Sequence, residues 1–144
     1  MVKAYSIITN GGFDVKPSLI KNNKNNKNKK NKILNDGVST KILPILRKVV
    51  TDGTASLANV DGYEIGGKTG TAEKSSLGIY SKDKKINTFV SVFPTSKPKF
   101  VLAVMLDEPE INEDYIYEYR DGSNFKLKGS PRNTAGWNSV EVSG

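Results

Sequence analysis

Hydrophobic residues recur at the spacing of an α-helix in two segments near the start of the chain. Residues 2–12 read VKAYSIITNGG, in which apolar side chains fall on every third position before a pair of glycines. This pattern predicts a helix that ends at the glycines. A second helix is predicted from Ser39, because the apolar residues after it follow the same period and Gly53 comes after the last turn. Pro44 lies early in this helix, where a proline costs least.

Farther along, the apolar pattern changes to that of β-strands. The segments INTFVSVF (86–93) and KFVLAVMLDEP (99–109) are apolar and partly β-branched, and the PTSKP sequence between them is typical of a turn. A third strand-like run, EIGGKTGTA (64–72), is made of small and hydroxylated residues, and a turn at Gly78 and SKDKK (81–85) follows it. Two helices followed by three strands in an antiparallel meander predict an α+β fold, with helices flanking an antiparallel sheet.

Positive charge is concentrated in one short stretch. The formal net charge is +7, but residues 21–32 contain only lysine and asparagine, six of each, so the remainder carries +1. A tract without apolar side chains cannot offset the entropy lost on ordering, so a mobile surface loop is predicted here. The alternative is an anion-binding arm for nucleic acid or acidic lipid. No aromatic residue lies among these lysines to stack on bases, and nucleic acid is therefore not expected as a partner.

Length and composition limit the kinds of site that the chain can form. With 144 residues it is one domain or part of a larger one. It has no cysteine and no histidine, so neither disulfides nor the commonest metal ligands are available, and no cofactor is expected. The longest apolar run, Phe100–Leu106, has seven residues, far too few to cross a bilayer. Neither a signal peptide nor a membrane anchor is predicted within the chain.

Residues 62–69, GYEIGGKT, match the phosphate-loop pattern G-x-x-x-x-G-K-[ST]. Such a loop requires a hydrophobic strand before its first glycine and a helix that opens at the Lys-Thr pair. The preceding ASLANVD is too polar for a buried strand, and Gly70-Thr71 is a poor first turn of a helix. A nucleotide-binding protein is therefore disfavoured. Asp107 and Glu108, which resemble a magnesium-binding strand end, are predicted to be a solvated strand end.

The same lysine opens KTGT, residues 68–71, and K-T-G accompanies S-x-x-K and S-D-N in penicillin-binding proteins and class A β-lactamases. The residue types suit such a site. Lys68 supplies a cation, the hydroxyls of Thr69 and Thr71 can hold a substrate carboxylate, and Gly70 leaves room for a substrate backbone beside the strand. The two glycines before the lysine allow other groups to approach closely. A backbone N–H of the strand can also stabilise an oxyanion.

Together with their neighbours, these residues resemble a known family. VVTDGTAS, GYEIGGKTGTAEK, residues 80–110 and TAGWNSVEVSG are similar to the C-terminal part of the transpeptidase domain of division-specific class B penicillin-binding proteins, most of all the alphaproteobacterial type. The resemblance covers most of the chain, apart from the Lys/Asn tract and residues 110–133. It implies part of the penicillin-binding/serine β-lactamase-like fold.

The resemblance also implies an activity and a set of site residues. The family's enzymes are D,D-transpeptidases that cross-link stem peptides of septal peptidoglycan and are acylated by β-lactams. Lys68, Thr69, Gly70 and Thr71 would line the substrate cleft, with Lys68 and Thr71 as catalytic residues and the Thr71 N–H as one half of the oxyanion hole. The full-length protein would be anchored in the inner membrane with a periplasmic domain, and membrane proteins of the division machinery would be its partners.

The sequence departs from the family in its catalytic motifs. The nucleophile of the family is the serine of S-x-x-K at the start of a helix, with S-x-N between it and K-T-G. The chain contains no S-x-N, and its S-x-x-K matches open no apolar helix; they begin at Ser18, Ser81, Ser96 and Ser123. We therefore expect residues 1–144 to be the C-terminal portion of a transpeptidase domain, without its nucleophile and inactive alone. The alternative is a non-catalytic module that binds an anionic ligand or peptide through Lys68 and the basic tract.

Three further expectations concern packing. Trp137 is expected to pack against the rim of the cleft, and the alternating tyrosines Tyr115, Tyr117 and Tyr119 are expected in a hairpin or long loop. The apolar runs FVSVF (89–93) and FVLAVML (100–106) are expected to lack full cover in this chain. We therefore expect marginal stability or aggregation.

Overall fold

The computed structural model describes residues 1–20, 31–76, 79–110, 116–118, 124–126, 134–136 and 139–143. The helices are α1 (Val2–Thr9), α2 (Val38–Thr51), the short 3-10 helix η1 (Ser56–Ala58) and α3 (Ser139–Ser143). The strands are β1 (Gly66–Ser76), β2 (Ile79–Phe93), β3 (Phe100–Asp107), β4 (Ile116–Glu118) and β5 (Asn124–Lys126).

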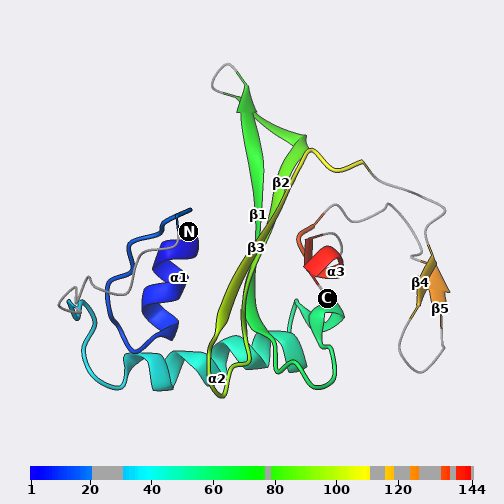
Figure 1. The fold of residues 1–144 in the computed structure, drawn as a ribbon. Coiled ribbons are helices and arrows are strands. Elements are labelled where there is room, and N and C mark those ends of the chain that lie inside the picture. The colour runs from blue at the N-terminus through cyan, green and yellow to red at the C-terminus, as the bar shows by residue number, and fades with distance from the viewer. Residues whose placement is uncertain are drawn as a thin grey trace.

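Strands β1, β2 and β3 form an antiparallel sheet in that order, which confirms the predicted meander. Helix α1 contacts β2 and β3 on one side, α3 contacts the same strands on the other, and α2 crosses the lower end of the sheet beside β1 (Figure 1). The expected α+β fold, an antiparallel sheet with flanking helices, is confirmed. Strands β4 and β5 form a separate antiparallel pair, so the predicted hairpin is present at these residues.

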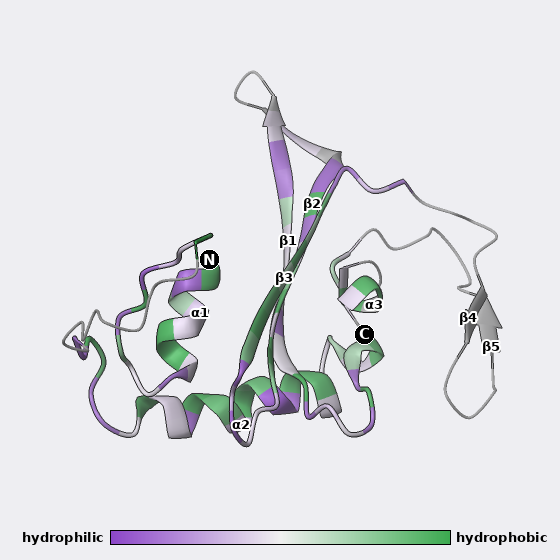
Figure 2. Ribbon diagram, viewed as in Figure 1, coloured by the Kyte–Doolittle hydropathy of each residue, from purple (hydrophilic) through white to green (hydrophobic). Residues whose placement is uncertain are grey.

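The turn predicted at SKDKK is wrong, because β2 already begins at Ile79 and runs through these residues. The register shows how the polar residues 81–85 are accommodated within the strand. Glu73 pairs with Lys85, but the next residue of β1, Lys74, pairs with Ser81. The extra residues of β2 form a bulge, which keeps both strands paired beyond it. In Figure 2 the coloured parts of β1 and β2 near this bulge are hydrophilic, whereas the lower halves of β2 and β3 are hydrophobic.

Helix α2 is amphipathic, and its buried residues are Leu46 and Val50. The expectation that Pro44 lies where a proline costs least is wrong, since the helix begins at Val38 and Pro44 is inside it. At this position the proline nitrogen has no hydrogen to donate to the carbonyl of Thr40. The Ser39 hydroxyl donates to the Ile8 carbonyl and so joins α2 to the end of α1.

The hydrophobic core lies between the sheet, the end of α2, η1 and α3. Phe89 is fully buried and belongs to one cluster of buried residues with Val50, Ala55, Ala58, Ile65 and Val140. Val90 and Val92, which point to the opposite face of β2, are also buried, so the expectation that FVSVF lacks cover is wrong. The matching expectation for FVLAVML is confirmed at Phe100 and Met105, which are 60% and 67% exposed.

The two sides of the Lys/Asn tract are joined to each other. Residues 21–30 lie outside the described part, but the tract's last two residues, Asn31 and Lys32, are placed. The Asp14 N–H donates to the Asn31 carbonyl at 2.7 Å, and the Lys32 ammonium lies 5.6 Å from the centre of the Phe13 ring.

Trp137, Tyr115 and Tyr119 also lie outside the described residues. Within the described part, no helix is long and apolar enough to span a bilayer.

Candidate functional site

The KTGT motif lies on β1, as the sequence predicted, and the glycines before it bring the strand close to its neighbours. Gly66 and Gly67 are both buried. A Cβ on Gly66 would lie 2.6 Å from the Thr95 methyl and 3.0 Å from backbone atoms of α2, and one on Gly67 would lie 2.5 Å from the Val90 carbonyl oxygen and 2.7 Å from the Phe89 ring. Real Cβ contacts are longer than this. The groups that approach these glycines are therefore the helix and β2.

The outer edge of β1 carries the backbone groups of Thr69 and Thr71. The Val90 carbonyl points towards β1, and Val90 pairs with Lys68, so these two residues form a hydrogen-bonded pair of the ladder. The backbone groups of the alternate residues, Thr69 and Thr71, are then directed away from β2. Among the described strands, β2 alone pairs with β1. The N–H groups of Thr69 and Thr71 thus face the free edge of the described sheet.

Lys68 and Gly70 lie at the exposed part of this edge. The Lys68 ammonium donates to the Thr69 carbonyl at 2.8 Å, which agrees with an outward-facing carbonyl. A Cβ on Gly70 would meet no atom within 4 Å. Gly70 is therefore beside open space, as the sequence reasoning expected, whereas Gly66 and Gly67 are needed for packing within the protein.

Both motif threonines have hydrogen-bond partners on segments outside the sheet. The hydroxyl oxygens of Thr69 and Thr54 lie 3.0 Å apart, and the Ala135 N–H donates to the Thr71 hydroxyl at 2.9 Å. Thr54 precedes η1, and Ala135 precedes α3. These contacts are possible because Thr69 and Thr71 share a face of the sheet with Phe89, on the side that η1 and α3 cover.

Arg47 of α2 fixes the chain just before the motif. Its guanidinium donates to the Ile65 carbonyl at 2.7 Å and to the Asn59 side-chain oxygen at 2.9 Å. Arg47, Thr54 and Ala135 were not predicted from the sequence, because each lies far along the chain from its partner, by up to 64 residues for Ala135 and Thr71. The sole local signal was a cationic residue beside the buried stripe of α2, between Leu46 and Val50.

The phosphate-loop interpretation does not fit this geometry. Gly62 lies in a turn, and Lys68 and Thr69 are inside a strand instead of at the start of a helix.

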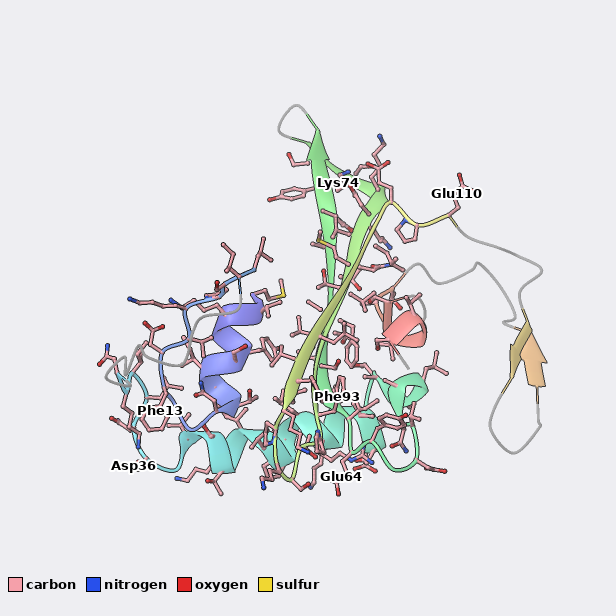
Figure 3. The ribbon with its side chains drawn as sticks, in the orientation of Figure 1. Phe13, Asp36, Glu64, Lys74, Phe93 and Glu110 are labelled. Atoms are coloured by element: carbon pink, nitrogen blue, oxygen red, sulfur yellow. The ribbon has the colours of Figure 1, made fainter. Side chains whose placement is uncertain are left out.

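Asp107 and Glu108 accept hydrogen bonds from Lys74 at 2.9 and 2.6 Å, at the upper end of the sheet where Lys74 is labelled in Figure 3. The hydrogen bond from Lys74 lowers the pKa of Glu108, and the bonds to Glu108 and Asp107 raise the pKa of Lys74. Within the described residues, no group of three acidic, cysteine or histidine side chains could hold a metal.

The S-x-x-K serines that the structure describes do not form a nucleophile site. Ser18 lies outside any helix or strand, Ser81 is on β2 and Ser96 is in the turn between β2 and β3. None of these three opens a helix, as expected, and Ser123 lies outside the described residues.

The described site consists of hydrogen-bond donors with one cation. Lys68, two threonine hydroxyls and outward-facing backbone N–H groups lie along one strand edge beside the open space at Gly70. Such a set can hold an anion or the carboxylate of an extended peptide. It contains no group that can act as nucleophile or general base without help from elsewhere.

Comparison with known proteins agrees with this geometry. The family model described as the penicillin binding protein transpeptidase domain matches residues 1–124. The chain is 41% identical over 81 residues to the peptidoglycan D,D-transpeptidase FtsI homolog of Chlorokybus atmophyticus, covering 56% of this chain and 12% of that protein. It is 31% identical over 116 residues to the probable peptidoglycan D,D-transpeptidase PenA of Neisseria flavescens, covering 80% of this chain and 28% of that protein. The chain thus spans a small part of the length of these relatives.

Solved structures show the same likeness in three dimensions. The transpeptidase domain of penicillin-binding protein 3 from Burkholderia pseudomallei superposes with a TM-score of 0.69 at 31% identity, over 75% of this chain and 33% of that one. Penicillin-binding protein 3 from Mycobacterium tuberculosis, complexed with ampicillin, superposes with a TM-score of 0.67 at 25% identity, over 99% of this chain and 32% of that one. The sheet and helices described above are thus part of the penicillin-binding fold, and the chain belongs to the penicillin-binding protein transpeptidase domain family.

Proposed function

We propose that residues 1–144 are the C-terminal portion of the transpeptidase domain of a division-specific class B penicillin-binding protein. The whole protein would be a D,D-transpeptidase that cross-links stem peptides of septal peptidoglycan, and the alphaproteobacterial type is the version it resembles most. The names of the relatives, which are peptidoglycan D,D-transpeptidases, support the activity.

In this proposal, β1 forms one wall of the substrate cleft. Lys68, Thr69, Gly70 and Thr71 bind the stem peptide, whose carboxylate lies against the two hydroxyls, and the N–H of Thr71 stabilises the oxyanion of the acyl-transfer step. The observation that carries the proposal is the outward direction of the Thr69 and Thr71 backbone groups, next to the open space at Gly70. No atom lies within 4 Å of the position that a Cβ would take at Gly70, so a ligand backbone can approach the strand beside this residue.

The nucleophilic serine and its lysine would come from a part of the protein that this chain does not contain. The whole protein would be anchored in the inner membrane with this portion in the periplasm, in contact with membrane proteins of the division machinery and sensitive to β-lactams. The ampicillin complex of the Mycobacterium tuberculosis relative supports β-lactams as ligands of the whole protein.

A fluorescent penicillin tests the assignment of the nucleophile. We expect the 144-residue chain to show no covalent labelling that survives denaturing electrophoresis. We expect a longer protein from the same gene to be labelled if it includes an in-frame upstream extension that carries S-x-x-K on a helix and S-x-N. Labelling of the short chain would contradict the proposal, and mass spectrometry of the adduct would then identify which of its serines reacts. A source gene without such an extension would favour the non-catalytic anion- or peptide-binding module.

A further inference from the structure

Thr54 is held rigidly beside the KTGT motif. The N–H of the next residue, Ala55, donates to the Val49 carbonyl at 3.0 Å, and Ala55 is fully buried. A Cβ on Gly136 would lie 2.7 Å from the Thr54 carbonyl oxygen, so the segment before α3 packs directly on the Thr54 backbone. The side chain of Thr54 is nevertheless exposed, with its hydroxyl 3.0 Å from that of Thr69. The backbone at Thr54 is therefore held by α2 and by the segment before α3, while the hydroxyl remains at the surface of the site.

The hydrogen bonds of the two motif threonines follow one scheme. A hydroxyl has one hydrogen to donate and two lone pairs that accept. Thr71 accepts the Ala135 N–H, which leaves the Thr71 hydrogen available for a ligand. When Thr54 donates to Thr69, the Thr69 hydrogen is available in the same way. Each motif threonine then accepts one hydrogen bond from outside the strand and offers its own hydrogen to the ligand.

We propose that Thr54 is a positioning residue of the carboxylate site, which acts by donating to the Thr69 hydroxyl and thereby directing the Thr69 hydrogen towards a bound carboxylate. This inference rests on the proposed function of β1. This arrangement predicts a preference for anionic acceptors over ligands that need an acceptor from the protein, because the oriented hydroxyls present hydrogens and the Lys68 ammonium lies 2.8 Å from the Thr69 carbonyl.

The test measures reversible binding of two probes to the isotope-labelled 144-residue chain by nuclear magnetic resonance. The probes are N-acetyl-D-alanyl-D-alanine and its C-terminal amide, which differ in the carboxylate alone. We expect the carboxylate probe to bind the wild type more tightly and to shift the amide signals of residues 68–71. In Thr54→Val, which keeps the shape and removes the hydroxyl, we expect about three- to tenfold weaker binding of the carboxylate probe, the loss of roughly one hydrogen bond. Affinity for the amide probe should change little, and Thr54→Ser should restore the preference.

Two controls separate positioning from structural support. Thr51→Val removes another exposed hydroxyl three residues earlier, and we expect it to bind both probes like the wild type. In a Thr69→Val background the effect of Thr54→Val should disappear, because the hydroxyl through which Thr54 acts is gone. An effect of the same size in that background would overturn the positioning role.

The outcomes also distinguish this inference from the proposed function. If the wild type prefers the carboxylate probe and Thr54→Val has the same preference, the role of Thr54 is refuted and the carboxylate site on β1 stands. If the wild type does not prefer the carboxylate, the carboxylate site fails, and the role of Thr54 fails with it.

Discussion

The guanidinium of Arg47 donates a hydrogen bond of 2.7 Å to the carbonyl of Ile65, the last residue before the strand that carries KTGT. Since Arg47 also donates to the Asn59 side chain, one side chain of α2 holds both sides of the turn at residues 59–65. This turn leads directly into β1 and so sets the position at which the strand enters the sheet. The contact therefore couples the position of α2 to the position of the candidate site.

Replacing Arg47 by methionine should lower the free energy of unfolding by about 2 kcal/mol, because charged hydrogen bonds contribute roughly 1.5–3 kcal/mol and two acceptors lose their donor. Denaturation in urea measures this. Lys41→Met is the matched control, since Lys41 is an exposed cation on the same helix, and its effect should stay within about 0.5 kcal/mol. Equal changes in the free energy of unfolding in the two variants would show that the Arg47 hydrogen bonds contribute nothing to stability.

Replacing each of two glycines of β1 by alanine should affect a different property, stability at Gly67 and ligand binding at Gly70. Gly67→Ala places a methyl group 2.5 Å from the Val90 carbonyl oxygen and 2.7 Å from the Phe89 ring, so we expect a destabilisation of about 1–3 kcal/mol from overpacking. Gly70→Ala meets no atom within 4 Å, and its stability should lie within about 1 kcal/mol of the wild type. The second variant should instead weaken binding of the carboxylate probe, since the methyl group occupies the open space. A Gly70→Ala variant that binds the probe normally would contradict the placement of the ligand beside this residue.

The cluster of Lys74, Asp107 and Glu108 should make stability depend on pH at both extremes. The pKa of Glu108 is lowered by the Lys74 hydrogen bond, so its contribution is present above the unfolded carboxyl pKa of about 4.3 and is lost as the pH falls through the lowered folded value. The pKa of Lys74 is raised by Glu108 and Asp107. Its contribution is complete below the unfolded lysine pKa of about 10.4 and is lost as the pH rises through the raised folded value.

Urea midpoints of the wild type and Lys74→Met measure this dependence. The difference between the two proteins should be constant near neutral pH and shrink in strong acid and strong base. Lys84→Met should show a smaller difference, because the Lys84 ammonium lies 3.7 Å from Glu108 and reaches no second carboxylate in the described residues. A difference between wild type and Lys74→Met that does not vary with pH would rule out the ion-pair origin.

Strand β3, which carries exposed apolar residues on both of its faces, should make the chain self-associate. Met105 and Leu102 are 67% and 39% exposed, and among the described strands β3 pairs with β2 alone. Exposed apolar residues on an unpaired edge promote association. We expect sedimentation velocity to show association that increases with concentration, and the double variant Leu102→Lys, Met105→Lys to be shifted towards monomer. Purely monomeric wild type at high concentration would contradict this.

Local patterns predicted α1, α2, the meander and the position of KTGT well, because each depends on residues close together in sequence, whereas η1 and α3 were not predicted. The start of β2 and the cost of Pro44 were predicted less well. Pro44 lies inside α2, where a proline removes a backbone hydrogen bond, and the polar SKDKK segment suggested a turn, but contacts with neighbouring segments override both preferences. Paired strands tolerate polar residues where both faces are exposed, as they are beyond the bulge at Lys74.

The supporting residues of the site could not be predicted from the sequence. Thr54 and Ala135 meet β1 through the packing of η1 and α3, and nothing in the local sequence around them signals this. Val90 and Val92 were expected to lack cover for the same reason, since the sequence does not reveal that α1 and α3 lie on opposite sides of the sheet (Figure 1).

Because Phe13 pairs with Lys32, the rest of the fold does not depend on the length of the segment between them. Since Phe13 and Lys32 lie side by side, the two ends of the intervening segment are held together by residues that the structure describes, and residues added between positions 20 and 31 need not change the distance between those ends. This place is therefore suited to an internal epitope or a fluorescent label, attached at a point where neither α2 nor the KTGT strand has to move.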